Sequence, residues 1–340
     1  MELTRYAQQS HLTTSRDPLL DVLVLLEFLT SEEYVSTLLT KKHGIPANSA
    51  AQRARRVVAH VRTALEYLEQ ALDGPAAVAF LPTYYGLLNL IKVYILASAH
   101  HSRLNDNRWH GAAYDVYAKQ SRSLRTEQVV VHPKGAISLF HEVVTGRPIR
   151  RKTVVKLGEL YPYILDIGAE WALAGGEPEL AIGINFEVAT LESGEKSARA
   201  FVGEPLNRPM LKLAQLPALT NVVRSPQVDQ WWIGNRSYPA STSDDEVLRQ
   251  HVRSFLLYYP RDGMSIVPVC GSRSVLMFEE FPIVLSFFHL SSVVRYNPEL
   301  LAKLRDSRYW PVVSSLRYHG LTSFLLLFWS FIQQETIFFH

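Results

Sequence analysis

The stretch FLPTYYGLLNLIKVYILASAHHSRLNDNRWHG, residues 80–111, decides the fold. It begins with a proline and two tyrosines, continues as an apolar run, and ends in a polar turn closed by His110-Gly111. Only Asn89 and Lys92 interrupt the run, a pattern typical of a helix buried in a core. A buried amide or amine without a partner costs several kcal/mol. We therefore expect both side chains to face the interior and to be hydrogen-bonded or ion-paired, either as structural anchors or within a site.

Two further residues of this stretch have two interpretations. Tyr84 and Tyr85 could stack on a nucleic-acid base, although packing as core aromatics explains them as well. Together with Asn89 and Lys92 they form the polar core that we expect for this helix.

Helical patterns surround this stretch in the first part of the chain. Asp17-Pro18 is typical of an N-cap followed by a first-turn proline. Apolar residues recur at helical spacing through residues 47–72, and Asp73-Gly74-Pro75 ends that pattern. Further helices are expected at residues 32–40, 83–99 and about 110–122. The first 125 residues therefore indicate a bundle of long helices.

After residue 125 the pattern becomes mixed and then helical again. β-Hairpins are predicted from residues 127–132 with 136–144, 179–191 with 196–202, and 265–269 with 274–278, and helices at 154–171 and 244–258. The fold class we predict is α+β, mostly α. Its three parts are a helical bundle (1–125), a mixed region with β-hairpins (126–278), and C-terminal helices (279–340) that pack back on the rest.

Composition limits the classes of protein that fit. Of the 340 residues 47% are hydrophobic and 20% charged, which is typical of a globular protein with a large core. The single cysteine, Cys270, argues against a disulfide framework and against Cys/His zinc sites. We expect no metal and no cofactor. The N-terminus lacks an apolar run and no stretch reaches the roughly 18 apolar residues of a membrane span, so we expect a cytoplasmic protein without a membrane partner.

Positive charge is concentrated in the first half. Residues 1–160 hold 20 Lys+Arg against 14 Asp+Glu (20 − 14 = +6), whereas residues 161–340 hold 15 against 18 (15 − 18 = −3). Basic surfaces attract phosphate, so RNA or DNA is a candidate partner. The residues we expect to bind it are Arg53, Arg55 and Arg56 on the long helix and Arg147, Arg150, Arg151 and Lys152 in a basic loop that continues to Lys156. A solvated charged surface is the alternative.

Two blocks of the sequence resemble a known family. LPTYYGLLNLIKVYIL closing on His-Gly, and LSFFHLSSVVRYNPELLAKL before a last apolar helix, resemble the recurrent blocks of the YaaC-like family of bacterial proteins. That family has no settled biochemical activity, so the resemblance implies organisation rather than a reaction. The helical first part also looks similar to HEPN domains, which often dimerise and many of which are metal-independent ribonucleases.

The HEPN resemblance implies a catalytic pair, an Arg followed after four to six residues by a His. Arg103 and His110 fit that spacing. A histidine can act as general acid or base near neutral pH, and an arginine can stabilise phosphate in the transition state. Other pairs have a comparable spacing, so only position distinguishes this one; they include Arg5/His11, Arg55/His60 and Arg125/His132. Leu104 departs from the polar residue that usually follows the arginine.

Three functions remain open from sequence. The first is a cytosolic bacterial interaction or nucleic-acid-binding subunit of a multi-protein, phage-defence-type system, with a protein partner or as a homodimer. The second is a metal-independent ribonuclease that uses Arg103 and His110. The third is a purely structural partner subunit. GxxxxGK[ST], GxGxxG, HExxH and GxSxG are all absent from the sequence.

Overall fold

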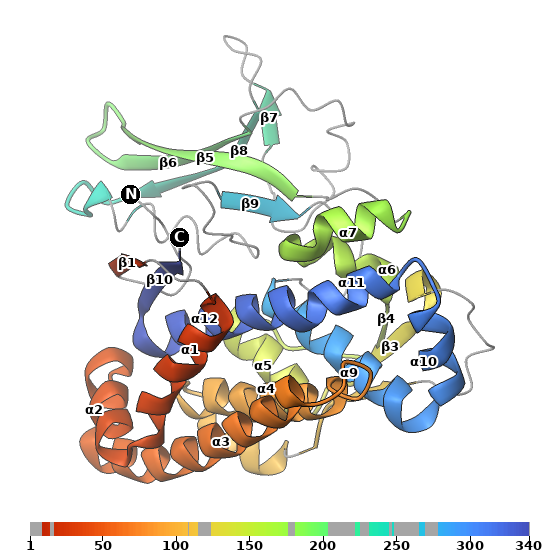
Figure 1. The fold of residues 1–340 in the computed structure, drawn as a ribbon. Coiled ribbons are helices and arrows are strands. Elements are labelled where there is room, and N and C mark those ends of the chain that lie inside the picture. The colour runs from red at the N-terminus through yellow and green to blue at the C-terminus, as the bar shows by residue number, and fades with distance from the viewer. Residues whose placement is uncertain are drawn as a thin grey trace.

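A helical part and a five-stranded sheet make up the structure (Figure 1). The computed structural model describes residues 9–13, 17–107, 109–114, 124–175, 181–202, 222–224, 231–244, 247, 265–268 and 278–339. The first helices are α1 (Pro18–Glu27), α2 (Glu32–His43), α3 (Ala47–Asp73) and α4 (Phe80–Leu96). The last helices are α9 (Glu280–Tyr296), α10 (Pro298–Arg305), α11 (Trp310–Ser315) and α12 (Leu321–Gln333).

Three sheets accompany the helices. A small antiparallel sheet has the order β2 (Ala112–Tyr114), β3 (Gln128–Val131), β4 (Thr153–Lys156). The larger antiparallel sheet has the order β7 (Val222–Arg224), β8 (Trp231–Tyr238), β6 (Lys196–Val202), β5 (Ala181–Thr190), β9 (Ser265–Pro268). In the third, β1 (Gln9–Thr13) pairs in parallel with β10 (Glu335–Phe339), which brings the two ends of the described chain together.

Local signals explain where the first helices begin and end. The Asp17 carboxylate accepts a hydrogen bond from the Leu20 amide, and Pro18 occupies the first turn of α1. The Ser31 hydroxyl caps α2 in the same way, and Gly44, at φ +64°, ends that helix in the left-handed region. Helices α1 to α4 therefore confirm the predictions of a helix after Asp17-Pro18 and of helices at residues 32–40, 47–72 and 83–99.

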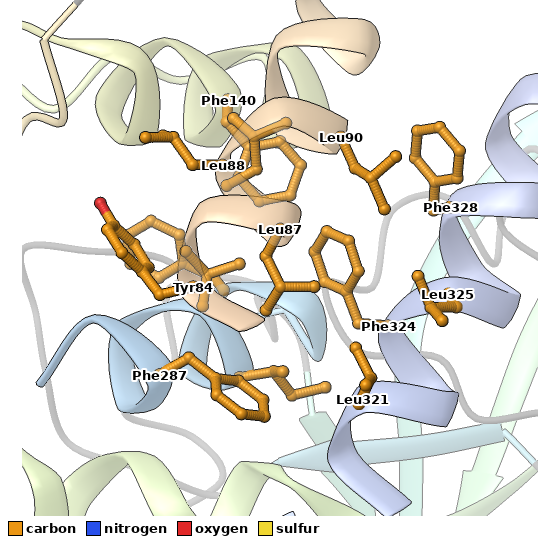
Figure 2. Close-up of a cluster of buried hydrophobic side chains, with 14 of the residues drawn as sticks. Tyr84, Leu87, Leu88, Leu90, Phe140, Phe287, Leu321, Phe324, Leu325 and Phe328 are labelled. Atoms are coloured by element: carbon orange, nitrogen blue, oxygen red, sulfur yellow. The ribbon is translucent and has the colours of Figure 1, made fainter. Parts of the chain in front are cut away.

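Helices α4 and α9 form the centre of the core. Every residue from Glu280 to Val293 is buried, and α4 is buried on almost all sides by α3, α5 (Ala136–Thr145), α9 and α12. Figure 2 shows side chains of α4, α5, α9 and α12 meeting in one apolar cluster. None of the helices that the structure describes combines the length and the apolar character needed to cross a membrane.

Gly86 allows α3 and α4 to pack closely. A Cβ atom at this position would lie 2.9 Å from the Leu68 side chain and 3.3 Å from the Ala64 carbonyl oxygen. The absence of a side chain therefore fixes the short separation of the two helices, and this contact sets which of their residues face each other.

The turn that carries His110 is fixed by two crossing glycines. A Cβ atom on Gly135 would lie 2.4 Å from the Gly111 Cα, and both residues have positive φ, +114° and +83°. The Ile137 amide donates to the His110 carbonyl oxygen at 3.0 Å, and the Ala136 amide donates to that of Trp109 at 2.9 Å. Residues at the start of α5 thus hold the backbone of His110.

Several predicted elements are wrong. Residues 136–144 form helix α5 and not a strand, because Ile137, Phe140 and His141 are buried at helical spacing between Gly135 and Gly146. The strand pattern of residues 127–132 is confirmed as β3, but β2 and β4 are its partners. Beta-branched residues in a short apolar run misled the prediction, since they favour strands only weakly.

Two predicted helices are also corrected. Instead of a helix over 154–171 the chain forms β4 and then short pieces, namely α6 (Leu157–Leu160), η4 (Tyr161–Tyr163), η5 (Leu165–Ile167) and α7 (Gly168–Leu173). Pro162 lies within this break and prevents a continuous helix. Strand β2 stands where a helix was expected from about residue 110, and residues 115–123 lie outside the described part.

The larger sheet agrees with the prediction in part. The hairpin of residues 179–191 and 196–202 is confirmed as β5 and β6. Strand β9 pairs with β5, whereas residues 274–277 and most of the helix predicted at 244–258 lie outside the described residues. One core cluster contains Leu19, Phe140 and Phe328, from all three predicted parts of the chain. The three-part division itself stays a prediction.

Gly135→Ala should destabilise the fold by about 2–4 kcal/mol, because the new Cβ atom would overlap Gly111 and the backbone conformation is open only to glycine. Gly146→Ala is the control. It has φ +69° but nothing within 4 Å of the added Cβ, so only the conformational strain of about 1–2 kcal/mol should appear. Urea denaturation measures both. Equal losses in the two variants would contradict the crossing contact.

Candidate anion-binding site

Half-buried polar and aromatic residues line the contact between α3 and α4. Helix α3 contributes Arg56, His60 and Tyr67, and α4 contributes Tyr85 and Lys92. The Tyr67 and Tyr85 rings stack with centroids 5.5 Å apart. One face of each helix therefore supplies groups that remain accessible at the edge of the core.

Asn89 connects the two helices. Its amide nitrogen donates to the Tyr85 carbonyl oxygen at 2.8 Å, and its side-chain oxygen lies 2.9 Å from His60 Nδ1. The oxygen can only accept, so the His60 Nδ1 carries a proton. In the neutral ring Nε2 is then left as an acceptor. Asn89 is 7% exposed, and both its amide nitrogen and its side-chain oxygen are hydrogen-bonded, as expected for a buried amide.

Tyr84 holds the ring of His110. Its hydroxyl lies 2.5 Å from His110 Nδ1, and the two rings stack at 5.4 Å. In Figure 2 the Tyr84 oxygen points away from the apolar cluster that surrounds its ring. Burial raises the pKa of Tyr84 well above its usual range, so the hydroxyl keeps its proton and donates it to Nδ1. The ring proton of neutral His110 then lies on Nε2, which has no partner among the described residues.

Arg295, at the end of α9, extends to Tyr85. Its Nη1 donates to the Tyr85 hydroxyl at 3.1 Å, and its guanidinium lies 5.8 Å from the centroid of that ring. Its Nε is buried and has no acceptor in the described part of the chain. The half-buried Tyr85 ring thus contacts Tyr67, His110 and Arg295.

Lys92 and Arg295, the charged side chains near His110, are both positive. Within the described residues Lys92 forms neither a hydrogen bond nor a salt bridge, and Arg295 forms no salt bridge. Burial lowers the pKa of Lys92. Burial also lowers the pKa of His110, and the charges of Arg295 and Lys92 add to this effect. The pKa of His60 is lowered by burial and by the charges of Lys92 and Arg56, against the bond to Asn89.

We call the group of His60, Tyr85, Lys92, His110 and Arg295 the cation cluster. Two positively charged side chains and two neutral imidazoles gather here, and no carboxylate among the described residues is in salt-bridge contact with them. Half-buried charge of one sign is unfavourable until an opposite charge compensates it. The arrangement is suited to an anion that accepts hydrogen bonds, such as a phosphate group. Lys92 departs from the expectation of an internal partner.

The structure places Arg103 in a different environment from His110. Its guanidinium donates two hydrogen bonds to the Glu142 carboxylate, at 2.7 and 2.9 Å, and contacts His100 Nδ1 at 3.0 Å. These hydrogen bonds are the main reason that the pKa of Glu142 is lowered. Arg103 and His110 share no contact within one chain, so their joint catalytic role stays a prediction.

The basic residues expected to bind nucleic acid have different environments. Arg53 donates to the carbonyl oxygens of Leu96 and Ser98 and thereby stabilises the end of α4. Arg55 is exposed and lies 3.7 Å from Glu32, and Arg56 donates to Asn105. In the basic loop Arg147, Arg150, Arg151, Lys152 and Lys156 are all exposed, and none forms a salt bridge with a described residue.

The sequence patterns did not indicate His60, Tyr67 or Arg295 as site residues. His60 and Tyr67 are seven positions apart on a helix whose apolar face is clear, so both could have been placed at the edge of that face. Nothing in the sequence indicated that Arg295 would reach α4, because the two are brought together only by the packing of α4 on α9.

The chain belongs to a recognisable class of protein. The family model described as YaaC-like Protein matches residues 27–332, and the chain therefore belongs to the YaaC-like family. The matched region contains the whole cation cluster. No curated protein and no solved structure matches the chain significantly. The likeness of the first part to HEPN domains stays a prediction.

Lys92→Met should raise the pKa of His110, because it removes a positive charge beside the ring. NMR titration of the ring signals measures this, and Lys41→Met on the exposed face of α2 is the control. In the wild type the midpoint should lie below the ordinary 6.5. The unfolded chain then binds more protons than the folded one, so this group should lower stability as the pH falls through 6.5 and below. A wild-type midpoint above 6.5 would contradict the arrangement.

Proposed function

We propose that the protein is a nucleic-acid-binding subunit and that the cation cluster is part of its binding surface. The observation that supports this most strongly is that Lys92 and Arg295, whose charges both act on His110, have no carboxylate partner among the described residues. A phosphate group would compensate both charges and accept the hydrogen bonds that they offer. His110 Nε2 supplies a further donor.

The aromatic residues support a nucleic acid over a simple anion. Tyr85 and Tyr67 are stacked and half-buried next to Arg295. Any base can stack on such a ring, whatever the sequence of the strand, while the cations bind the phosphate beside that base. The exposed basic loop, Arg147 to Lys156, offers further contacts to a phosphate backbone.

In this proposal the subunit acts in the bacterial cytoplasm within a multi-protein, phage-defence-type system, with a protein partner or as a homodimer. An exposed apolar stripe, formed by two residues of α1 and by Phe28 directly after that helix, supports a protein partner. Leu20, Val24 and Phe28 lie four residues apart and are 53%, 64% and 55% exposed. Such a stripe on a surface helix is typical of an interaction face.

A metal-independent ribonuclease is the second candidate function. His110 favours it, because the ring is oriented by Tyr84 and keeps Nε2 without a described partner, beside two cations. An imidazole in this state could take part in proton transfer at a 2′-hydroxyl. Arg103 could serve such a reaction only if it released Glu142 or came from a second copy of the chain.

Binding to single-stranded RNA and DNA tests the main proposal. Lys92→Met and Arg295→Gln should each weaken binding about tenfold and flatten its salt dependence, since each removes about one phosphate contact. Fluorescence anisotropy across a salt series measures both effects, and Lys41→Met controls for net charge. Affinity and salt slope that match the wild type in both variants would contradict a role for the cluster.

The basic loop is tested by reversing its charge. Arg150→Glu, Arg151→Glu and Lys152→Glu together should weaken binding uniformly across sequences, because backbone contacts carry no sequence information. Since all three side chains are exposed, thermal stability should hardly change. A triple variant that binds like the wild type with the same salt slope would remove the loop from the proposal.

The nuclease candidate makes its own prediction. RNA cleavage should persist in EDTA, leave a 2′,3′-cyclic phosphate, and be abolished by His110→Ala without loss of the fold. The reason is that the attacking group is the RNA's own 2′-hydroxyl and the imidazole handles its proton. Full cleavage by His110→Ala, analysed beside a mock preparation, would refute it.

A further inference from the structure

The cation cluster holds more positive charge than one internal phosphate of a nucleic acid compensates. Lys92 and Arg295 both carry a positive charge, and both are half-buried. A phosphodiester within a strand carries a single negative charge. A phosphomonoester carries between one and a half and about two negative charges near neutral pH, which matches the two unpaired cations.

The donors of the cluster are also numerous enough for a monoester. Arg295 has donors that are not used by Tyr85, including a buried Nε without a described acceptor. Lys92 offers its ammonium group and His110 its Nε2 proton. The three oxygen atoms of a terminal phosphate could accept from all three residues, whereas a phosphodiester has two free oxygens.

The tautomers of the two histidines add a second feature. Tyr84 leaves His110 with a donor at Nε2, and Asn89 leaves His60 with an acceptor at the same atom. His110 can therefore bond a phosphate oxygen directly. His60 can do so only after it gains a proton, which a nearby dianion favours. His60 can therefore become positively charged when the ligand carries a second negative charge.

From these observations we infer that the cation cluster binds a nucleoside phosphomonoester, with the phosphate among Lys92, His110 and Arg295 and the base against the Tyr85–Tyr67 pair. This inference rests on the proposed function and names the part of the nucleic acid that is bound, a phosphorylated end. A free nucleoside monophosphate has the same chemistry and is the other source of such a ligand. A strand end also suits half-buried groups, since no chain has to continue beyond it.

The test measures the affinity of the wild-type protein for four probes. Three are the same oligonucleotide with a 5′-phosphate, with a 3′-phosphate and with neither, and the fourth is a nucleoside monophosphate. One phosphorylated end should bind at least about tenfold more tightly than the unphosphorylated strand, as expected for added charge-assisted hydrogen bonds. Lys92→Met should reduce this preference to about threefold or less, and Lys41→Met should keep it. Melting curves show whether each variant is folded.

The other outcomes distinguish the phosphomonoester inference from the proposal of nucleic-acid binding. Equal binding of phosphorylated and unphosphorylated strands would overturn the inference and leave nucleic-acid binding in place. Binding of the monophosphate alone, lost in Lys92→Met, would support the phosphomonoester site and overturn the strand as its source. A preference for phosphorylated ends that persists in both Lys92→Met and Arg295→Gln would overturn the assignment to this cluster. No binding of any probe would overturn both proposals.

Discussion

The burial of α4 is the constraint on which the rest of the structure depends. The helix has α3, α5, α9 and α12 around it, so its polar residues can lie only along the narrow edge next to α3. Gly86 sets the distance to α3, and this distance brings Asn89 to His60 and Tyr85 to Tyr67. Core packing therefore determines the position of every residue in the cation cluster.

The core fixes the orientations of the side chains in the site. Tyr84 extends its ring into the apolar cluster and its hydroxyl to His110, while the crossing of Gly111 and Gly135 holds the backbone of the same histidine. Arg295 is placed by a helix almost two hundred residues further along the chain. The cations are consequently held together by the fold, which accounts for how two positive charges can remain close without a described counter-charge.

Sequence predicted the long helices well because their apolar periodicity and caps are local signals. The fold class, α1 to α4 and the C-terminal helices follow from such signals, as does the β5–β6 hairpin. The errors at α5 and at residues 154–171 arise in short apolar runs, where strand and helix patterns overlap and tertiary contacts decide. The parallel pairing of β1 with β10 joins segments from opposite ends of the chain, so no local pattern could indicate it.

The site was predictable only in part for the same reason. Asn89, Lys92, Tyr84 and Tyr85 were conspicuous as polar groups in an apolar run, and His110 as the end of the stretch. His60 and Arg295 become site residues only through helix packing, and Arg103, selected by its spacing to His110, pairs with Glu142 instead. Spacing along the chain indicates proximity within a helix, but it does not do so across a turn that changes direction.

The proposed anion site of Lys92 and Arg295 has no counter-charge from the described residues of the chain. A crystal structure of the protein grown with tungstate, a phosphate analogue with a strong anomalous signal, tests it most directly. We expect an anomalous peak within hydrogen-bonding distance of Lys92 Nζ, the Arg295 guanidinium and His110 Nε2. A structure with no peak there, and with a carboxylate of the same chain in salt-bridge contact with Lys92 and Arg295, would contradict it.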